Sequence, residues 1–156
     1  MQGHGVGGCL TKEKREGRER VGFTMSDLMS GREAELASIK GALGPRVGRY
    51  RVNLNTLADI GARSLRDAAA GAEVIVIDEI GPMELTSPDF RKAADACFSS
   101  PRPILAIVHQ QMKDPLIEKV RELQSKQMIE VTLQNRGKLA ENIASEILAQ
   151  LPEPPS

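Results

Sequence analysis

The feature that most constrains the fold of this chain is a run of four β-branched residues, Val74-Ile75-Val76-Ile77, followed directly by Asp78 and Glu79. A continuous apolar run without alternation is typical of a strand that is buried on both faces, as in the parallel sheets of α/β proteins. The sequence therefore predicts a strand over residues 73–80 whose carboxyl end carries two adjacent carboxylates.

Strand and helix patterns alternate on either side of this segment. Ser87-Pro88 and Asp114-Pro115 both pair a capping residue with a proline at the first helical position, which is typical of helix starts. The expected order predicts an α/β fold with a three-layer, mostly parallel sheet covered by helices on both faces. The expected strands are 104–108 and 128–132, and the expected helices are 56–70, 87–99, 114–125 and 137–151.

The first half of the chain is less regular. Residues 6–14 and 20–26 flank a charged turn that contains Gly17, which predicts an exposed β-hairpin. Glycines and a proline interrupt residues 30–48, so we expect mostly loop there. Residues 49–54 alternate polar and apolar side chains, which predicts a half-buried strand, and Asn55 is then placed to cap the helix that follows.

Composition limits the classes of protein to consider. We expect one domain over residues 1–151 and a disordered tail over 152–156. The formal net charge is zero, whereas nucleic-acid binders usually carry a basic excess. Cys9 and Cys97 lie far apart, and no apolar run approaches the ~20 residues that a membrane helix needs. We therefore expect a cytoplasmic monomer that binds neither nucleic acid nor membrane.

Asp78 and Glu79 match the Walker B pattern, in which a buried strand delivers acidic residues to a nucleotide. An aspartate at that position can hold Mg²⁺ directly or through a water. A glutamate one residue later can orient or deprotonate the attacking water. The alternative is an acidic pair that merely ends a strand in a turn.

The residues that follow resemble the signature of one family, the small P-loop nucleoside-triphosphatases first described from thermophiles, which have cancer-related human relatives. The similarity runs from Gly7 to Leu148. It is carried by Asp78-Glu79-Ile80-Gly81-Pro82-Met83-Glu84-Leu85 with Ser87 and Phe90, by a hairpin pattern of Gly7, Gly8, Thr11, Glu13, Arg15, Gly17, Arg20, Gly22 and Phe23, by Val47, Gly48, Tyr50 and Val52, and by Asn135-Arg136.

The resemblance implies Mg²⁺-dependent hydrolysis of ATP, GTP and other nucleoside triphosphates to diphosphate and phosphate. It assigns Asp78 to the metal and Glu79 to the base. The nucleotide-binding residues that we expect are Val76, Ile77, Asp78, Glu79, Ile80, Gly81, His109, Asn135, Arg136 and Arg20. Simpler interpretations stay open: His109 can bind a loop carbonyl, Asn135 can cap a helix, and Arg20 with its neighbours Arg15 and Arg18 can lie on a solvated hairpin face.

The family pattern also breaks in one place. Its first strand and its Gly-x-x-x-x-Gly-Lys-[Ser/Thr] loop have no counterpart here. No Gly-Lys-Ser or Gly-Lys-Thr occurs in the sequence, and Gly137-Lys138 is followed by Leu139. The Gly3-x-Gly5-x-x-Gly8 run lacks the preceding strand that a nucleotide fingerprint requires. By analogy, the absent strand belongs between residues 104–108 and 128–132.

Nucleotide affinity depends on the backbone N–H groups and the lysine of such a loop. One hypothesis is therefore that the natural product begins roughly 30 residues earlier, which is the size of a strand-loop-helix unit. The alternatives are a noncatalytic remnant that acts as a binding module, or a related nucleotide kinase.

Overall fold

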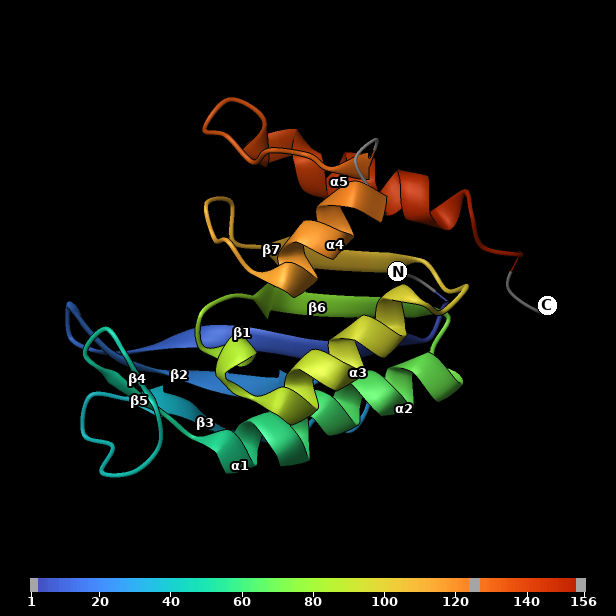
Figure 1. Ribbon diagram of the computed structural model, residues 1–156. Coiled ribbons are helices and arrows are strands. Elements are labelled where there is room, and N and C mark those ends of the chain that lie inside the picture. The colour runs from blue at the N-terminus through green and yellow to red at the C-terminus, as the bar shows by residue number, and fades with distance from the viewer. Residues whose placement is uncertain (1–2, 124–126, 154–156) are drawn as a thin grey trace.

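The computed structural model describes residues 3–123 and 127–153 and contains one sheet of seven strands (Figure 1). The strand order across the sheet is β4-β5-β3-β2-β1-β6-β7. The strands are β1 (Val6–Glu16), β2 (Glu19–Asp27), β3 (Glu33–Ser38), β4 (Arg46–Val47), β5 (Tyr50–Val52), β6 (Val74–Ile80) and β7 (Ile104–Val108).

The sheet is mixed rather than mostly parallel, which corrects the prediction from the sequence. Only β1 with β6 and β6 with β7 pair in parallel, and the other four pairings are antiparallel. Short connections account for this, because a chain that turns back within a few residues can pair only antiparallel, whereas a parallel partner needs a long crossover. The predicted hairpin of β1 and β2 is confirmed, as are the strands at β5, β6 and β7.

The helices between β5 and β7 lie together on one face of the sheet (Figure 1). A single helical stretch after β5 joins α1 (Leu54–Thr56), the π-helical η1 (Leu57–Ala62) and α2 (Arg63–Gly71). The residue that caps it is Asn53 rather than Asn55, since the Asn53 side chain accepts hydrogen bonds from the amides of Asn55 and Thr56. The later helices are the 3₁₀ turn η2 (Glu84–Thr86), α3 (Pro88–Phe98), α4 (Pro115–Leu123) and α5 (Arg136–Leu148).

Gly61 lies inside the π-helical turn, where its missing side chain brings two elements together. A Cβ at this position would lie 2.9 Å from the ring of Phe90 and 3.0 Å from the sulfur of Met25. π-Helical turns within α-helices usually have a local cause. Here the glycine allows Phe90 of α3 and Met25 of β2, two core residues, to pack closely against η1.

Two predicted segments differ from the structure. Residues 30–48, expected to be mostly loop, contain β3 and β4. Pairing with β2 and β5 outweighs the weak strand propensity of the β3 sequence. Residues 128–132, expected to be a strand, have none of the ladder pairing of a strand. The predicted end of α4 near Ser125 and the last residues of the expected tail fall on positions 124–126 and 154–156, outside the described residues.

The core lies between the helices and the central strands. It includes Cys9, Met25, Leu57, Ile77 and Phe90, all of them fully buried. Because β6 runs between β1 and β7 and is parallel to both, the carboxyl ends of β6 and β7 lie at the same edge of the sheet. None of the helices within 3–123 and 127–153 has the length and apolar character needed to cross a membrane.

Candidate active site at the carboxyl end of β6

Asp78 and Glu79 lie near the carboxyl end of β6, as the sequence predicts for a buried strand that ends in acidic residues. Asp78 is in register with Leu10 of β1 on one side and with Ile107 of β7 on the other. His109 follows β7 directly, and its backbone N–H donates to the carbonyl of Ile80 at 3.3 Å. The structure therefore brings Asp78, Glu79, Ile80 and His109 together at one edge of the parallel part of the sheet.

Both carboxylates are half-buried, and within the described residues neither forms an ion pair or a side-chain hydrogen bond. Burial raises the pKa of Asp78 above its usual value. Burial also raises the pKa of Glu79. Positive charge at His109 opposes this rise in pKa, whereas the negative charge of Asp78 adds to it. Two neighbouring carboxylates that form no ion pair with lysine or arginine are a favourable site for an external cation.

Mg²⁺ fits this donor set. It is a hard cation that prefers oxygen ligands, and in nucleotide sites it takes one or two carboxylates together with phosphate oxygens and water. A preformed cluster of three or more ligating side chains, which residues 3–123 and 127–153 do not contain, is not required for that mode of binding. Asp78 and Glu79 are the two carboxylates at this end of β6 that could contribute such ligands.

The turn after β6 contains a buried carboxyl group for which no role was predicted from the sequence. Glu84 is only 2% exposed, and its Oε2 accepts a hydrogen bond from the Gly81 N–H at 3.2 Å. Burial, first of all, and then the nearby charges of Glu79 and Asp78 raise the pKa of Glu84 to about 7. In the sequence, the signal for a contact between these two carboxyl groups was that Glu84 lies five positions after Glu79, across a Gly-Pro turn.

Gly81 separates the two glutamates. A Cβ on Gly81 would lie 3.2 Å from Oε1 of Glu79 and 3.3 Å from Oε2 of Glu84. The side chain of any other residue would therefore press on both carboxyl groups. Gly81 thus allows the Glu79 carboxylate to lie directly beside the turn that Glu84 holds.

A second group near this edge also lacks a protein partner. Thr11 follows Leu10, which pairs with Asp78. Its hydroxyl oxygen is buried and has no hydrogen-bond partner among the residues that the structure describes. Buried hydroxyls are usually paired with protein, water or ligand. From the sequence, Thr11 was noted only as part of the family's hairpin pattern, with no role assigned to it.

The apolar residues that were expected to contact nucleotide lie mainly in the core. Ile77 and Ile80 are fully buried, and Val76 is partly buried. Neither Ile77 nor Ile80 therefore has surface open to a ligand at this edge. His109, in contrast, is exposed, and its own carbonyl accepts a hydrogen bond from the Arg121 guanidinium at 3.2 Å.

Asn135 does not cap α5 through its side chain, although it occupies the N-cap position. Its Oδ1 accepts from the Thr132 N–H at 2.8 Å, and its Nδ2 donates to the Glu130 carbonyl at 2.7 Å. The side chain thus fixes the turn that precedes α5. Arg136 is exposed in the first turn of α5, and none of its described contacts reaches β6.

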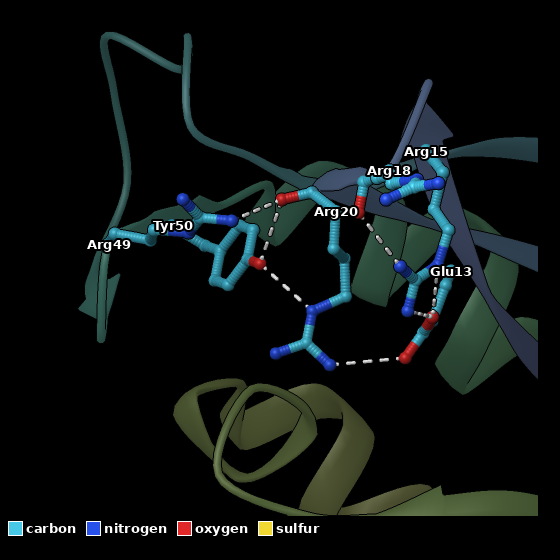
Figure 2. Close-up of polar contacts among 6 residues, drawn as sticks. All are labelled: Glu13, Arg15, Arg18, Arg20, Arg49 and Tyr50. Atoms are coloured by element: carbon cyan, nitrogen blue, oxygen red, sulfur yellow. Dashed lines mark hydrogen bonds and ion pairs between the residues drawn. The ribbon is translucent and has the colours of Figure 1, made fainter.

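Arg20 lies in a cluster of its own on the hairpin (Figure 2). Its Nε donates to the Tyr50 hydroxyl at 3.0 Å, its Nη1 pairs with Glu13 at 3.1 Å, and its guanidinium lies 5.3 Å from the ring centre of Phe23. Arg15 also pairs with Glu13 and donates to the carbonyl of Arg18. The contacts described for Arg20 therefore all lie within the hairpin and with Tyr50 of β5, and none reaches Asp78 or Glu79.

Known proteins resemble this chain over most of its length. A family model described as "NTPase" matches residues 1–144. A protein named nucleoside-triphosphatase THEP1 from Thermofilum pendens is 43% identical over 143 residues, which cover 91% of this chain and 79% of the relative. The protein of the same name from Methanosarcina acetivorans is 40% identical over 149 residues, covering 96% of this chain and 83% of the relative.

Two solved structures show the same fold. The crystal structure of THEP1 from Aquifex aeolicus matches with a TM-score of 0.79 and 30% identity, covering 91% of this chain and 83% of that one. The solution structure of a human cancer-related nucleoside triphosphatase matches with a TM-score of 0.75 and 31% identity, covering 94% and 84% of the two chains. The chain therefore belongs to the NTPase family, a family of nucleoside-triphosphatases.

Proposed function

We propose that this chain supplies the metal-binding and water-activating part of a site that hydrolyses nucleoside triphosphates, ATP and GTP among them, to diphosphate and phosphate. The observation that carries the proposal is the pair of half-buried carboxylates, Asp78 and Glu79, which form no ion pair among the described residues at the carboxyl end of a parallel strand. The names of the relatives support the same reaction.

Each carboxylate has a separate role in this proposal. Asp78 would hold Mg²⁺, and the bound ion would neutralise charge on the β- and γ-phosphate oxygens. Glu79 orients the attacking water and accepts its proton. Burial raises the pKa of Glu79, and a more basic carboxylate accepts a proton more readily as long as it stays ionised. In this proposal His109, which is exposed beside this edge, contacts the terminal phosphate.

The compartment that fits this activity is the cytoplasm. Cys9 and Cys97 are both buried free thiols. Burial raises the pKa of Cys9 to about 12, so this thiol is protonated and unreactive at neutral pH. The proposed partners are nucleoside triphosphates alone, bound by a monomer.

The metal role can be tested directly in the 156-residue chain. Mn²⁺ replaces Mg²⁺ at oxygen sites and broadens the NMR signals of nearby amides. We expect selective broadening at the carboxyl end of β6, which Asp78→Asn abolishes. Asp67→Asn removes an exposed carboxylate on α2 that pairs with Arg63 and is the matched control, with unchanged broadening. Equal broadening in wild type and Asp78→Asn would remove Asp78 from the metal role.

Hydrolysis is tested by phosphate release from ATP and GTP without an acceptor, which separates a triphosphatase from a kinase. Because the 156 residues contain no Gly-Lys-Ser or Gly-Lys-Thr, we expect this chain alone to turn over nucleotide at or near background. Where in-frame codons upstream of Met1 encode such a loop, the extended protein should be active and Glu79→Gln should abolish its activity. Retained turnover in that variant would exclude Glu79 as the base, and a stop codon immediately upstream would favour a noncatalytic binding module.

A further inference from the structure

Glu79 occupies an irregular position in the pairing of β6 with β7. Asp78 pairs with Ile107, and the next pair in the ladder joins Ile80 to Val108. One residue of β6, Glu79, therefore falls between two partners that are consecutive in β7. Such an extra residue is a β-bulge, and bulges beside active sites often re-aim a side chain. The regular alternation of the strand thus does not set the direction of the Glu79 side chain.

The turn that follows β6 is held by a side chain from inside the protein. Glu84 is only 2% exposed, and its Oε2 accepts a hydrogen bond from the Gly81 N–H at 3.2 Å. The carbonyl of Gly81 accepts from the Leu85 N–H at 3.0 Å. Both polar groups of the Gly81 backbone are therefore paired within the turn, and the Glu84 side chain supplies one of the two partners.

Space, rather than backbone conformation, explains the glycine at position 81. The φ angle of Gly81 lies outside the positive range that favours glycine. A Cβ there would, however, lie 3.2 Å from Oε1 and 3.3 Å from Cδ of Glu79, and 3.3 Å from Oε2 of Glu84. All of these atoms belong to carboxyl groups. The Glu79 carboxylate therefore lies over the turn, in the space that the side chain of any other residue would take.

From these contacts we propose that Gly81 and Glu84 are positioning residues for Glu79, whose carboxylate they hold over the turn at the carboxyl end of β6. Glu84 fixes the turn through the Gly81 N–H, and the missing side chain of Gly81 leaves the space that the Glu79 carboxylate occupies. This role rests on the proposed function of Glu79 as the base. A displacement of about 1 Å in an active site can cost about 10²-fold in rate, so the placement of this carboxylate governs the chemical step.

The position of the Glu79 side chain can be measured in the 156-residue chain without metal or nucleotide. NMR records the contacts of the Glu79 γ-protons by the nuclear Overhauser effect and the Glu79 χ1 rotamer by three-bond couplings. In wild type we expect a contact with the Gly81 α-protons and one dominant rotamer. Gly81→Val should remove both, because its methyl groups take the place of the carboxylate. Gly71→Val is the matched control, since a Cβ there meets only the Met29 Cε at 3.8 Å, and it should leave Glu79 unchanged.

Two substitutions of Glu84 separate positioning from packing. Glu84→Gln keeps an oxygen that accepts from the Gly81 N–H, so the contact and the rotamer of Glu79 should be those of wild type. Glu84→Met has a similar length but no acceptor. It should therefore average the Glu79 rotamer and speed exchange of the Gly81 amide by about tenfold or more. If Glu84 served only packing, both variants would leave Glu79 unchanged.

The effect on catalysis is measured in an extended protein that contains the phosphate-binding loop. There Gly81→Val should lower kcat by about tenfold or more and change KM by less than about threefold, because a displaced base slows the chemical step and leaves nucleotide binding intact. Glu84→Gln should keep kcat within about threefold of wild type, whereas Glu84→Met should lower it as Gly81→Val does.

Two NMR results would overturn the inference: Glu79 contacts that survive in folded Gly81→Val, or the same Glu79 contacts in Glu84→Gln and Glu84→Met. An extended protein that Glu79→Gln inactivates but Gly81→Val leaves fully active would also overturn it, with the proposed function intact. Turnover retained in Glu79→Gln would instead remove the proposed base, and with it the catalytic role of this turn. If Gly81→Val does not fold, the comparison of the two Glu84 variants still decides.

Discussion

Glu84 holds a carboxyl group among buried side chains, next to the carboxylates of Glu79 and Asp78. Its pKa is raised from 4.5 to about 7, so the folded protein binds this proton more tightly than the unfolded chain does. The contribution of neutral Glu84 to the free energy of unfolding is therefore fully present below about pH 4.5 and is lost as the pH rises to about 7. Above that pH the charged form of the carboxyl group must be buried, which costs free energy.

Replacing Glu84 by glutamine should remove this pH dependence. The amide oxygen can still accept the hydrogen bond from Gly81, and the side chain carries no charge at any pH. We expect Glu84→Gln to unfold with a free energy within about 1 kcal/mol of wild type near pH 5, and to be more stable by about 3 kcal/mol near pH 8. Denaturant titrations at both pH values measure this. Glu122→Gln, on the exposed side of α4, should show no such change, and a constant difference across the pH range would contradict the prediction.

At the residue scale, the sequence predicted the neighbours along the chain better than the neighbours in space. Asp78 and Glu79 at the strand end followed from the apolar run that precedes them, and His109 followed from the next parallel strand. The burial of Glu84 and the hydrogen bond between Arg20 and Tyr50 could not be predicted in this way, because each depends on segments that only the folded sheet brings together. Whether Arg20, Asn135 and Arg136 contact nucleotide stays a prediction.

Among the elements, β1 and β6 are in close backbone contact at Gly8. This residue has φ of +116°, and a Cβ there would lie 1.9 Å from the carbonyl oxygen of Val76. The obstructing atom belongs to the backbone of the central strand, so it cannot move without breaking the parallel pairing. Within the glycine run at the start of the chain, Gly8 thus serves strand packing.

Gly8→Ala should destabilise the protein by at least about 2 kcal/mol, through backbone strain and loss of pairing between β1 and β6. Gly137→Ala is the matched control, since Gly137 lies in the first turn of α5 with no atom within 4 Å of an added Cβ. Alanine there should stabilise the helix by about 0.5–1 kcal/mol. Thermal and denaturant unfolding measure both, and equal effects of the two substitutions would disprove the assignment of Gly8 as a packing glycine.

α3 and α4 are joined by the ion pair of Arg91 and Asp114. Asp114 is 7% exposed, accepts from the Arg91 Nη1 at 3.0 Å, and accepts from the Leu116 N–H at 2.9 Å as the cap of α4. The hydrogen bonds from Arg91 lower the pKa of Asp114 below its usual 3.8. The contribution of this carboxylate is therefore present above about pH 3.8 and is lost as the pH falls through the lower value in the folded protein.

Asp114→Ala should cost about 2–3 kcal/mol near neutral pH, because it removes both the cap and the partner of a partly buried arginine. Asp95→Ala breaks the exposed pair with Lys119 and should cost less than about 1 kcal/mol. The gap between wild type and Asp114→Ala should narrow in acid, below about pH 3.8. Denaturant unfolding of the three proteins at neutral and acid pH measures both effects, and a gap that widens in acid would contradict this account.

Helix starts were the elements that local sequence predicted best. Ser87 caps α3 through its side chain, as predicted, and α4 begins at Pro115. Such signals are local, since a cap satisfies amides within its own first turn. β3 and residues 128–132 were predicted wrongly, because a strand exists only where a neighbour pairs with it. β3 has such neighbours in β2 and β5, whereas residues 128–132 have none among the described residues.

Across the whole molecule, burial is uneven. The strands β1 and β6, with α2 and α3, surround the core, whereas α5 lies beyond β7 at the edge of the sheet (Figure 1). α3 has 11 residues and buries Phe90, Ala93, Ala94 and Cys97, while α5 has 13 residues and buries only Ile147. Helices in proteins are stabilised mainly by packing of their apolar face, so two helices of similar length should differ in local stability.

We expect the amides of α5 to exchange through local opening at least about 2 kcal/mol below the free energy at which α3 opens, which should approach that of global unfolding. Hydrogen exchange of the native chain at low denaturant concentrations measures both helices in one experiment, so α3 is the internal control. The Ile147→Ala variant should speed exchange in α5 alone, because this residue provides the helix's buried contact. Exchange of α5 as slow as that of α3 would show instead that contacts with β7 and residues 127–131, which line the same pocket as α5, hold this helix to the rest of the molecule.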